Sequence, residues 1–265
     1  MGGRGSYYQT KIKQLVAKAA EVKAETIATF KSKLEPAIKE FPFYWYSQGA
    51  SGEEFDLKDV RYVLPTKNKK SESEEESIKA VGGLDRTGGS CASAAMAYIM
   101  RRAGYDVTDF RGGQSREVFS QKATGVAIAN LDGVESYMEK SKSYQAAAHK
   151  LLKKVEPGKQ YLLRTGGHAA IIKRVDDQYM YLELQDKPEK NGWKKMGGTK
   201  YASDVDWTLN YRFGATRTRR RREIPSTLVS VDSLIKSKQF QQLAGFFNTN
   251  ALGLKQLKGA GGHVK

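Results

Sequence analysis

Four side chains have the types and the order of a thiol-dependent catalytic site: Cys91, His168, Glu183 and Gln185. Cys91 is the single cysteine of the chain and follows the run Thr87-Gly-Gly-Ser90. The glycines permit a tight turn, Ser90 is a suitable N-cap and Gly104 is a natural stop, so we predict a helix that begins at Cys91. A helix N-terminus favours the nucleophilic thiolate, and its amides can hold an oxyanion. The other interpretation is a buried and unreactive thiol, because free cysteines are among the most buried residues.

A cysteine nucleophile needs a base, and the chain has three histidines. His149 lies in a predicted helix with polar neighbours, and His263 lies in a glycine-rich tail that we expect to be disordered. His168 opens an apolar strand directly after two glycines, where other groups can come close. His168 is therefore the candidate base; the alternative is a histidine with a purely structural role in a strand.

The third member of such a site is an acceptor that orients the imidazole. Asp176-Asp177 is a two-residue turn that joins predicted strands at 168–175 and 179–185 into a hairpin. Alternation puts Glu183 and Gln185 on one face of the second strand. A carboxylate in an apolar strand is costly without a partner, so we take Glu183 as the orienting acid, with Gln185 or Asp186 in reserve. Alternatively, Glu183 lines the solvent face of an edge strand.

The elements that must position these residues divide the chain into four parts. Residues 1–65 contain a long amphipathic helix with a basic exposed side over 9–40, which Pro36 should end or bend, and then an aromatic segment. Residues 66–78 have almost no apolar content and read as a flexible charged loop. The catalytic domain spans 79–214, and 215–265 form an Arg-rich linker with a helical extension over about 231–247. Inside the catalytic domain we expect a polar helical stretch over 132–154 and a first strand over 160–164.

These residues resemble the papain-like cysteine hydrolases, in particular the compact branch found among bacterial polymorphic toxins and phage head-associated proteins. The similarity covers about 82–195 and rests on the run Arg101-Arg-Ala-Gly-Tyr-Asp-Val107, on Gly-x-His at His168, and on Glu183-Leu-Gln185, where the family has Asp-x-Gln. Gln48 is the one upstream candidate for a papain-type oxyanion glutamine. The resemblance implies an α+β, papain-like fold, in which the cysteine helix packs on a small antiparallel sheet. It also implies peptide cleavage or glutamine deamidation on a protein substrate.

The charge of the chain suggests a second kind of partner. The net charge is +16 with a pI near 9.7, and five arginines follow the catalytic domain closely: Arg217, Arg219, Arg220, Arg221 and Arg222. Arginine forks suit phosphate, so this basic tract is a candidate nucleic-acid contact; the alternative is a solvated linker. The alternative function is accordingly a non-catalytic, basic virion or nucleic-acid-binding protein on a papain-like scaffold, with phage capsid or head proteins as further partners.

Composition excludes several other classes of protein. One cysteine and three histidines cannot fill a cysteine-rich zinc site, and we expect neither a metal nor a cofactor. No apolar run approaches the ~20 residues of a membrane helix, and the N-terminus lacks the apolar segment of a Sec signal. We expect the protein in a host or bacterial cytoplasm or in a phage virion.

Overall fold

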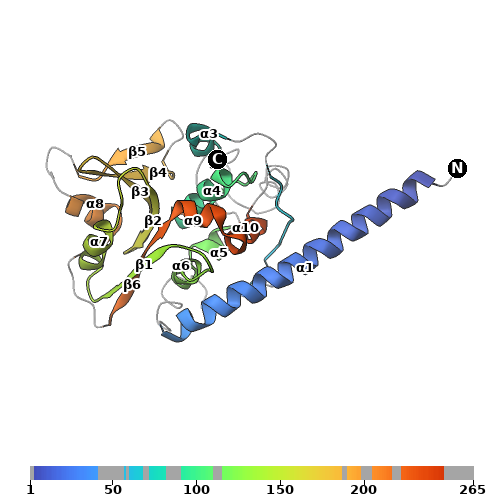
Figure 1. Ribbon diagram of the computed structural model, residues 1–265, viewed down its shortest axis with the longest axis horizontal. Helices are drawn as coiled ribbons and strands as arrows, with labels where there is room; N and C mark the ends of the chain where they lie inside the picture. The colour runs from blue at the N-terminus through green and yellow to red at the C-terminus, as the bar shows by residue number, and fades with distance from the viewer. Residues whose placement is uncertain are drawn as a thin grey trace, which may run out of the picture.

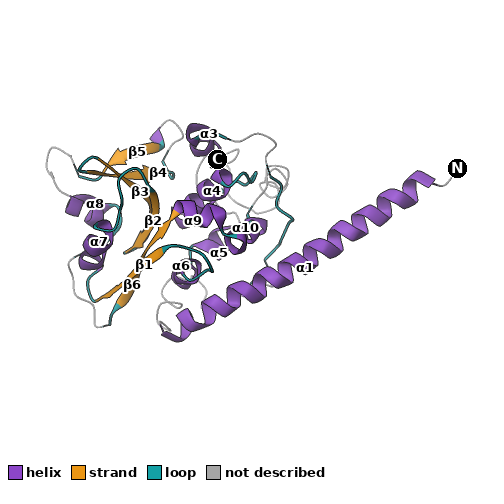
Figure 2. Ribbon diagram, viewed as in Figure 1, coloured by secondary structure: helices purple, strands orange, loops and turns teal. Residues whose placement is uncertain are grey.

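A computed structural model of the chain describes residues 3–40, 57, 60–67, 72–81, 91–109, 115–186, 190–197, 205–216 and 222–247. Its centre is a six-stranded antiparallel sheet with the strand order β1-β6-β2-β3-β4-β5 (Figure 2). The strands are β1 (Ser136–Ser141), β2 (Gln160–Thr165), β3 (His168–Val175), β4 (Gln178–Glu183), β5 (Gly192–Lys195) and β6 (Ile224–Ser230). Helices accompany the sheet, so the predicted α+β class is confirmed.

Two tight turns connect the strands that carry the candidate site. Gly166 joins β2 to β3 with φ +59°, and a Cβ there would lie 2.2 Å from the carbonyl oxygen of Phe213, so glycine is required at this position. Asp176 joins β3 to β4 with φ +50°, a conformation that Asp tolerates better than most residues. The predicted hairpin of the strands at 168–175 and 179–185 is therefore confirmed, although its second strand, β4, ends at Glu183.

Helices cover both faces of the sheet (Figure 1). Strand alternation directs Leu162 and Ile171 to one face and Leu163 and Ile172 to the other, and each set belongs to a separate apolar cluster. The first face packs under α4 (Cys91–Arg102), α5 (Ser115–Phe119), α6 (Lys122–Ala129), α9 (Val231–Lys236), α10 (Lys238–Gln242) and the 3-10 turn η2 (Leu243–Phe246). The second packs under α7 (Tyr144–Leu152) and α8 (Val205–Tyr211).

The N-terminal helix α1 (Gly3–Glu40) is attached to the body by its second half only. Ile27, Phe30 and Leu34 are buried there in the first apolar cluster, and the helix lies against α6 and α10. Of the two predicted effects of Pro36, an end or a bend, the first does not occur, since α1 continues to Glu40.

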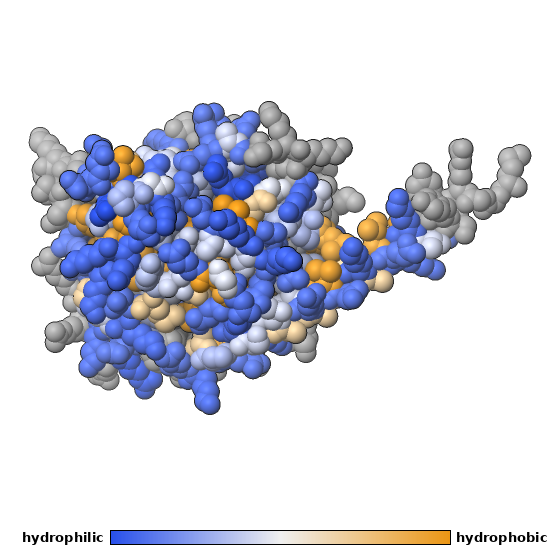
Figure 3. All heavy atoms as spheres, in the orientation of Figure 1, coloured by the Kyte–Doolittle hydropathy of each residue, from blue (hydrophilic) through white to orange (hydrophobic). Residues whose placement is uncertain are grey.

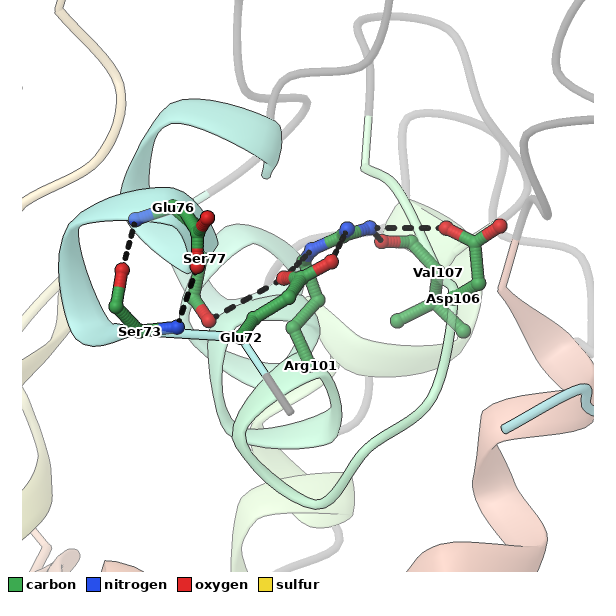
Figure 4. A network of polar contacts seen from close by, with 7 residues as sticks. All are labelled: Glu72, Ser73, Glu76, Ser77, Arg101, Asp106 and Val107. Carbon is green, nitrogen blue, oxygen red and sulfur yellow. Dashed lines mark hydrogen bonds and ion pairs between the residues drawn. The ribbon is translucent and has the colours of Figure 1, made fainter. Parts of the chain in front are cut away.

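The predicted flexible loop over 66–78 is wrong in its second half, where the chain forms α3 (Glu74–Ala80). Ser73 and Glu76 make a reciprocal capping box at its N-terminus (Figure 4). Glu74, Glu75 and Glu76 lie in its first turn, where negative charge is favourable. The acidic run therefore starts a helix, although it contributes almost no apolar surface.

Two further predictions need correction. The expected helical stretch over 132–154 is instead strand β1 followed by α7. The segment 215–265, expected as linker and helical extension, supplies β6, which pairs with both β1 and β2. A boundary at residue 214 would therefore cut through the sheet, because β6 is an inner strand. The helical segment over 231–247 is confirmed as α9, α10 and η2.

Candidate active site

The helix that carries the candidate nucleophile forms as predicted. α4 begins at Cys91 and ends at Arg102, and Gly104 follows with φ +90°. Residues from Ala92 to Arg101 are all buried, whereas Cys91 itself is half-buried. The run 82–90, with the predicted N-cap Ser90, lies outside the described residues. Local sequence signals therefore place a partly accessible thiol at the start of a twelve-residue helix.

The far end of α4 is held by a buried arginine (Figure 4). Arg101 is 4% exposed; its Nη1 donates to the carbonyl of Val107 (2.7 Å) and to Asp106 (3.2 Å), and its Nε donates to Glu72 (2.9 Å). A buried guanidinium needs such partners to offset its desolvation. The run Arg101–Val107, which carries most of the family resemblance, thus has a structural role here, because it joins α4 to α3 and to the following loop.

The four predicted catalytic residues line one pocket. Its walls are Cys91, Ala95, His168, Ala169, Ala170, Leu182, Glu183, Leu184 and Gln185. Strands β3 and β4 pair from Val175↔Gln178 to Ile172↔Tyr181. The pocket lies next to the end of this paired stretch, beyond Ile172 and Tyr181. The enclosed space is about 10 Å³, roughly enough for one water molecule. A substrate side chain can therefore enter only if the pocket opens.

His168 is a neutral histidine in this arrangement. Its ring packs edge-on against Phe213, with 5.0 Å between ring centroids and 81° between planes. Burial, and secondarily the positive charge of Arg212, lower the pKa of His168 to about 3. The imidazole is therefore uncharged at neutral pH, and it has a lone pair with which to accept a proton.

Glu183 is buried, but its partner differs from the predicted one. The residue is 5% exposed; its Oε1 accepts from the backbone N–H of Gln185 (2.9 Å) and pairs with Nη2 of Arg212 (2.5 Å). Arg212 directly follows α8, and its side chain is 34% exposed. Because β5 pairs with β4, the alternative of a solvent-facing residue on an edge strand is wrong. The carboxylate is bound by Arg212 and, among the described residues, shows no hydrogen bond to His168.

Sequence reasoning missed Arg212. The signal that could have suggested a basic partner was Glu183 itself, since a carboxylate buried in an apolar strand needs a cation. Nothing local selects one cation from the 45 lysines and arginines of the chain.

The thiol and the imidazole reach the pocket from opposite faces of the sheet. His168 shares its face with Ala170 and Ile172, in the layer of α7 and α8, whereas Cys91 belongs to the α4 layer. Within the described part of the chain, no hydrogen bond joins the two side chains. The structure thus brings Cys91 and His168 to one pocket, and a direct proton transfer requires the imidazole to turn toward α4.

The remaining candidates are separate from this pocket. His149 pairs with Asp206 (Nε2 to Oδ1, 2.5 Å) on the surface between α7 and α8. Arg222 is exposed just before β6. His263, Gln48, Arg217, Arg219, Arg220 and Arg221 lie outside the described residues.

Among the described residues, no helix combines the length and apolar character of a bilayer span, and no three His, Cys, Asp or Glu side chains converge as a metal site requires. Comparison with known proteins gives no match: no family model matches the chain, and neither a curated protein nor a solved structure is significantly similar to it.

Proposed function

We propose that this chain is a papain-like cysteine hydrolase that acts on a protein, by cleaving a peptide bond or by deamidating a glutamine. The observation that carries the proposal is the pocket shared by Cys91, His168, Glu183 and Gln185, which come from a helix, two strands and the segment that follows β4. The half-buried thiol at a helix start also suits nucleophilic attack. A phage or a bacterial conflict system is the biological setting that the motif resemblance implies.

In the proposed reaction, His168 accepts the proton of the Cys91 thiol, and the sulfur attacks the substrate carbonyl carbon. Backbone N–H groups at the start of α4 stabilise the oxyanion. The tetrahedral intermediate collapses to a thioester as His168 protonates the leaving amine or ammonia. Water, deprotonated by His168, then hydrolyses the thioester and regenerates the thiol.

The electrostatics of the pocket require the imidazole of His168 to move before it accepts the thiol proton. Burial and the charge of Arg212 hold the pKa of His168 at about 3, so proton transfer from the Cys91 thiol is unfavourable in this arrangement. Moving the imidazole away from Arg212 and toward the sulfur of Cys91 favours the transfer, because the imidazolium then pairs with the thiolate. Glu183 and Arg212 then serve to position the β4 side of the pocket, and Gln185 remains beside the reacting groups.

Alkylation of Cys91 tests the activated pair without a known substrate. We would measure the pH dependence of iodoacetamide labelling in the wild type, in His168→Ala and in His149→Ala, which removes a surface histidine as a matched control. A thiol pKa below about 8.5 that depends on His168 and not on His149 supports the proposal. An unreactive thiol, or one that is indifferent to His168, contradicts it.

Mass spectrometry of an unfolded protein substrate then separates the two reactions. Cleavage produces new termini, whereas deamidation converts glutamine to glutamate in an intact chain. Either product should disappear in Cys91→Ser, provided that circular dichroism shows unchanged folding.

The second candidate is a non-catalytic nucleic-acid-binding protein, and the net charge of +16 favours it. Duplex DNA should then bind with a steep salt dependence. Replacing the five arginines of the basic tract with glutamine should weaken this binding, whereas Cys91→Ser should leave it unchanged.

A further inference from the structure

The first half of α1 exposes an apolar stripe beyond the folded body. Residues 9–18 are all exposed, and Ile12, Leu15 and Val16 are 60, 53 and 64% exposed. Figure 1 shows this part of the helix extending away from the other elements, and apolar side chains gather on it in Figure 3. Elsewhere in the described residues, the large apolar side chains exposed to this extent are Val175 and Tyr211, which lie apart from each other in the chain.

This exposed stripe, formed by Ile12, Leu15, Val16 and Ala19, continues the stripe that packs against the body. Phe30 lies eighteen residues after Ile12, which is five whole turns at 3.6 residues per turn, so the two side chains leave the helix in the same direction. Phe30 is 2% exposed in the apolar cluster, and its half of α1 lies against α6 and α10. One helix face is therefore covered by the body at one end and uncovered at the other.

The charge around the stripe limits what can cover it. Residues 9–20 contain Lys11, Lys13 and Lys18 and no acidic residue. A second copy of the same segment would bring lysines against lysines, whereas an acidic partner is attracted. Nucleic acid would satisfy the lysines but offers no apolar surface for Ile12, Leu15 and Val16.

The direction of the stripe argues against a lipid surface. Because the stripe is collinear with the residues that face α6 and α10, the body occupies the same side of α1. A flat bilayer laid along the exposed stripe would collide with that body. A single helix, about 10 Å across, can lie along the stripe and extend the layer of α6 and α10.

We propose that the exposed stripe of α1 binds an acidic amphipathic helix of a partner protein. The partner presents apolar residues at three- and four-residue spacing to Ile12, Leu15 and Val16, and glutamates or aspartates to the flanking lysines. This surface is independent of the Cys91 pocket, so the proposal stands or fails separately from the hydrolase.

The test uses the full chain and two synthetic peptides of 21 residues. Both carry leucine at heptad positions a and d; one has glutamate at the flanking positions and the other has lysine. Binding is measured by fluorescence anisotropy. The triple variant Ile12→Gln, Leu15→Gln, Val16→Gln removes the stripe from an exposed helix face, and Val175→Gln, at a strand end, is the matched control for loss of an exposed apolar side chain.

The glutamate peptide should bind the wild type and the Val175→Gln variant equally, and the triple variant at least tenfold more weakly. Reversing Lys13 and Lys18 to glutamate should shift the preference to the lysine peptide. Three results overturn the proposal. They are no binding of the glutamate peptide, equal binding of that peptide by the triple variant, and a wild type that is a dimer while the triple variant is a monomer. Stripe-dependent binding to phosphatidylserine vesicles or to duplex DNA instead of the peptide also overturns it.

Discussion

The substitution Arg212→Gln should raise the pKa of His168 and change how stability depends on pH. Arg212 is the second cause of the lowered pKa, after burial, so its loss should raise the pKa without restoring the usual value near 6.5. A like charge nearby typically shifts a pKa by about one pH unit or more.

The size of the stability change follows from the linkage between proton binding and folding. His168 has a folded-state pKa of about 3 against 6.5 unfolded, so the unfolded chain binds the extra proton between these values, and stability is lost as the pH falls from about 6.5 toward 3. The full difference corresponds to roughly 5 kcal/mol, and a rise of one pH unit removes roughly 1.4 kcal/mol of it. Arg212→Gln also leaves Glu183 without its cation, which should cost about 2–3 kcal/mol near neutral pH, less than for a fully buried pair because Arg212 is one-third exposed. The variant should therefore be less stable at pH 7 and should lose less stability on acidification.

NMR titration of the histidine ring protons measures the pKa directly, with His168→Gln identifying the resonance and His149 as an internal reference. Urea unfolding at pH 7 and pH 4 measures the stability difference. The double variant Arg212→Gln, Glu183→Gln should raise the pKa of His168 as much as Arg212→Gln does, because the rise comes from the loss of Arg212. A His168 titration unchanged in Arg212→Gln would refute the electrostatic account of the pocket.

Two further predictions concern the framework of the site. Arg101→Met should lower the free energy of unfolding by about 3 kcal/mol, because it leaves the carboxylate of Glu72 without its cation. Lys79→Met removes an exposed ion pair and should lower it by less than ~0.5 kcal/mol in the same urea measurement. A similar cost for both would contradict a structural role for the Arg101 network. Gly166→Ala should cost at least about 2 kcal/mol, since its Cβ would lie 2.2 Å from a backbone carbonyl oxygen; Gly133→Ala, also at positive φ but with open space around it, should cost only about 1 kcal/mol. Equal thermal shifts for the two glycine variants would show that the contact is unimportant.

Local signals in the sequence were sufficient for the elements that carry the candidate residues. The N-cap Ser90 and the glycine stop at Gly104 predicted α4, and the Asp176-Asp177 turn predicted the hairpin that bears His168 and Glu183. These signals work because a helix end or a two-residue turn is determined by a few neighbouring residues. Chain order and residue type were likewise enough to select the four residues that share one pocket.

Only the tertiary structure decided which partners those residues have. β6 enters the sheet between β1 and β2, where the hydroxyl of Ser226 lies 2.8 Å from that of Thr165. Such long-range pairing leaves no local pattern. Arg212 reaches Glu183 from the end of α8, and the two faces of the sheet separate Cys91 from His168. The sequence by itself determined the helix and the hairpin that carry Cys91, His168 and Glu183, because helix ends and two-residue turns are local. The protonation state, the ion pairs and the side-chain orientation of these residues depend on burial and on charges from distant segments. That burial and those charges exist only once the chain has folded.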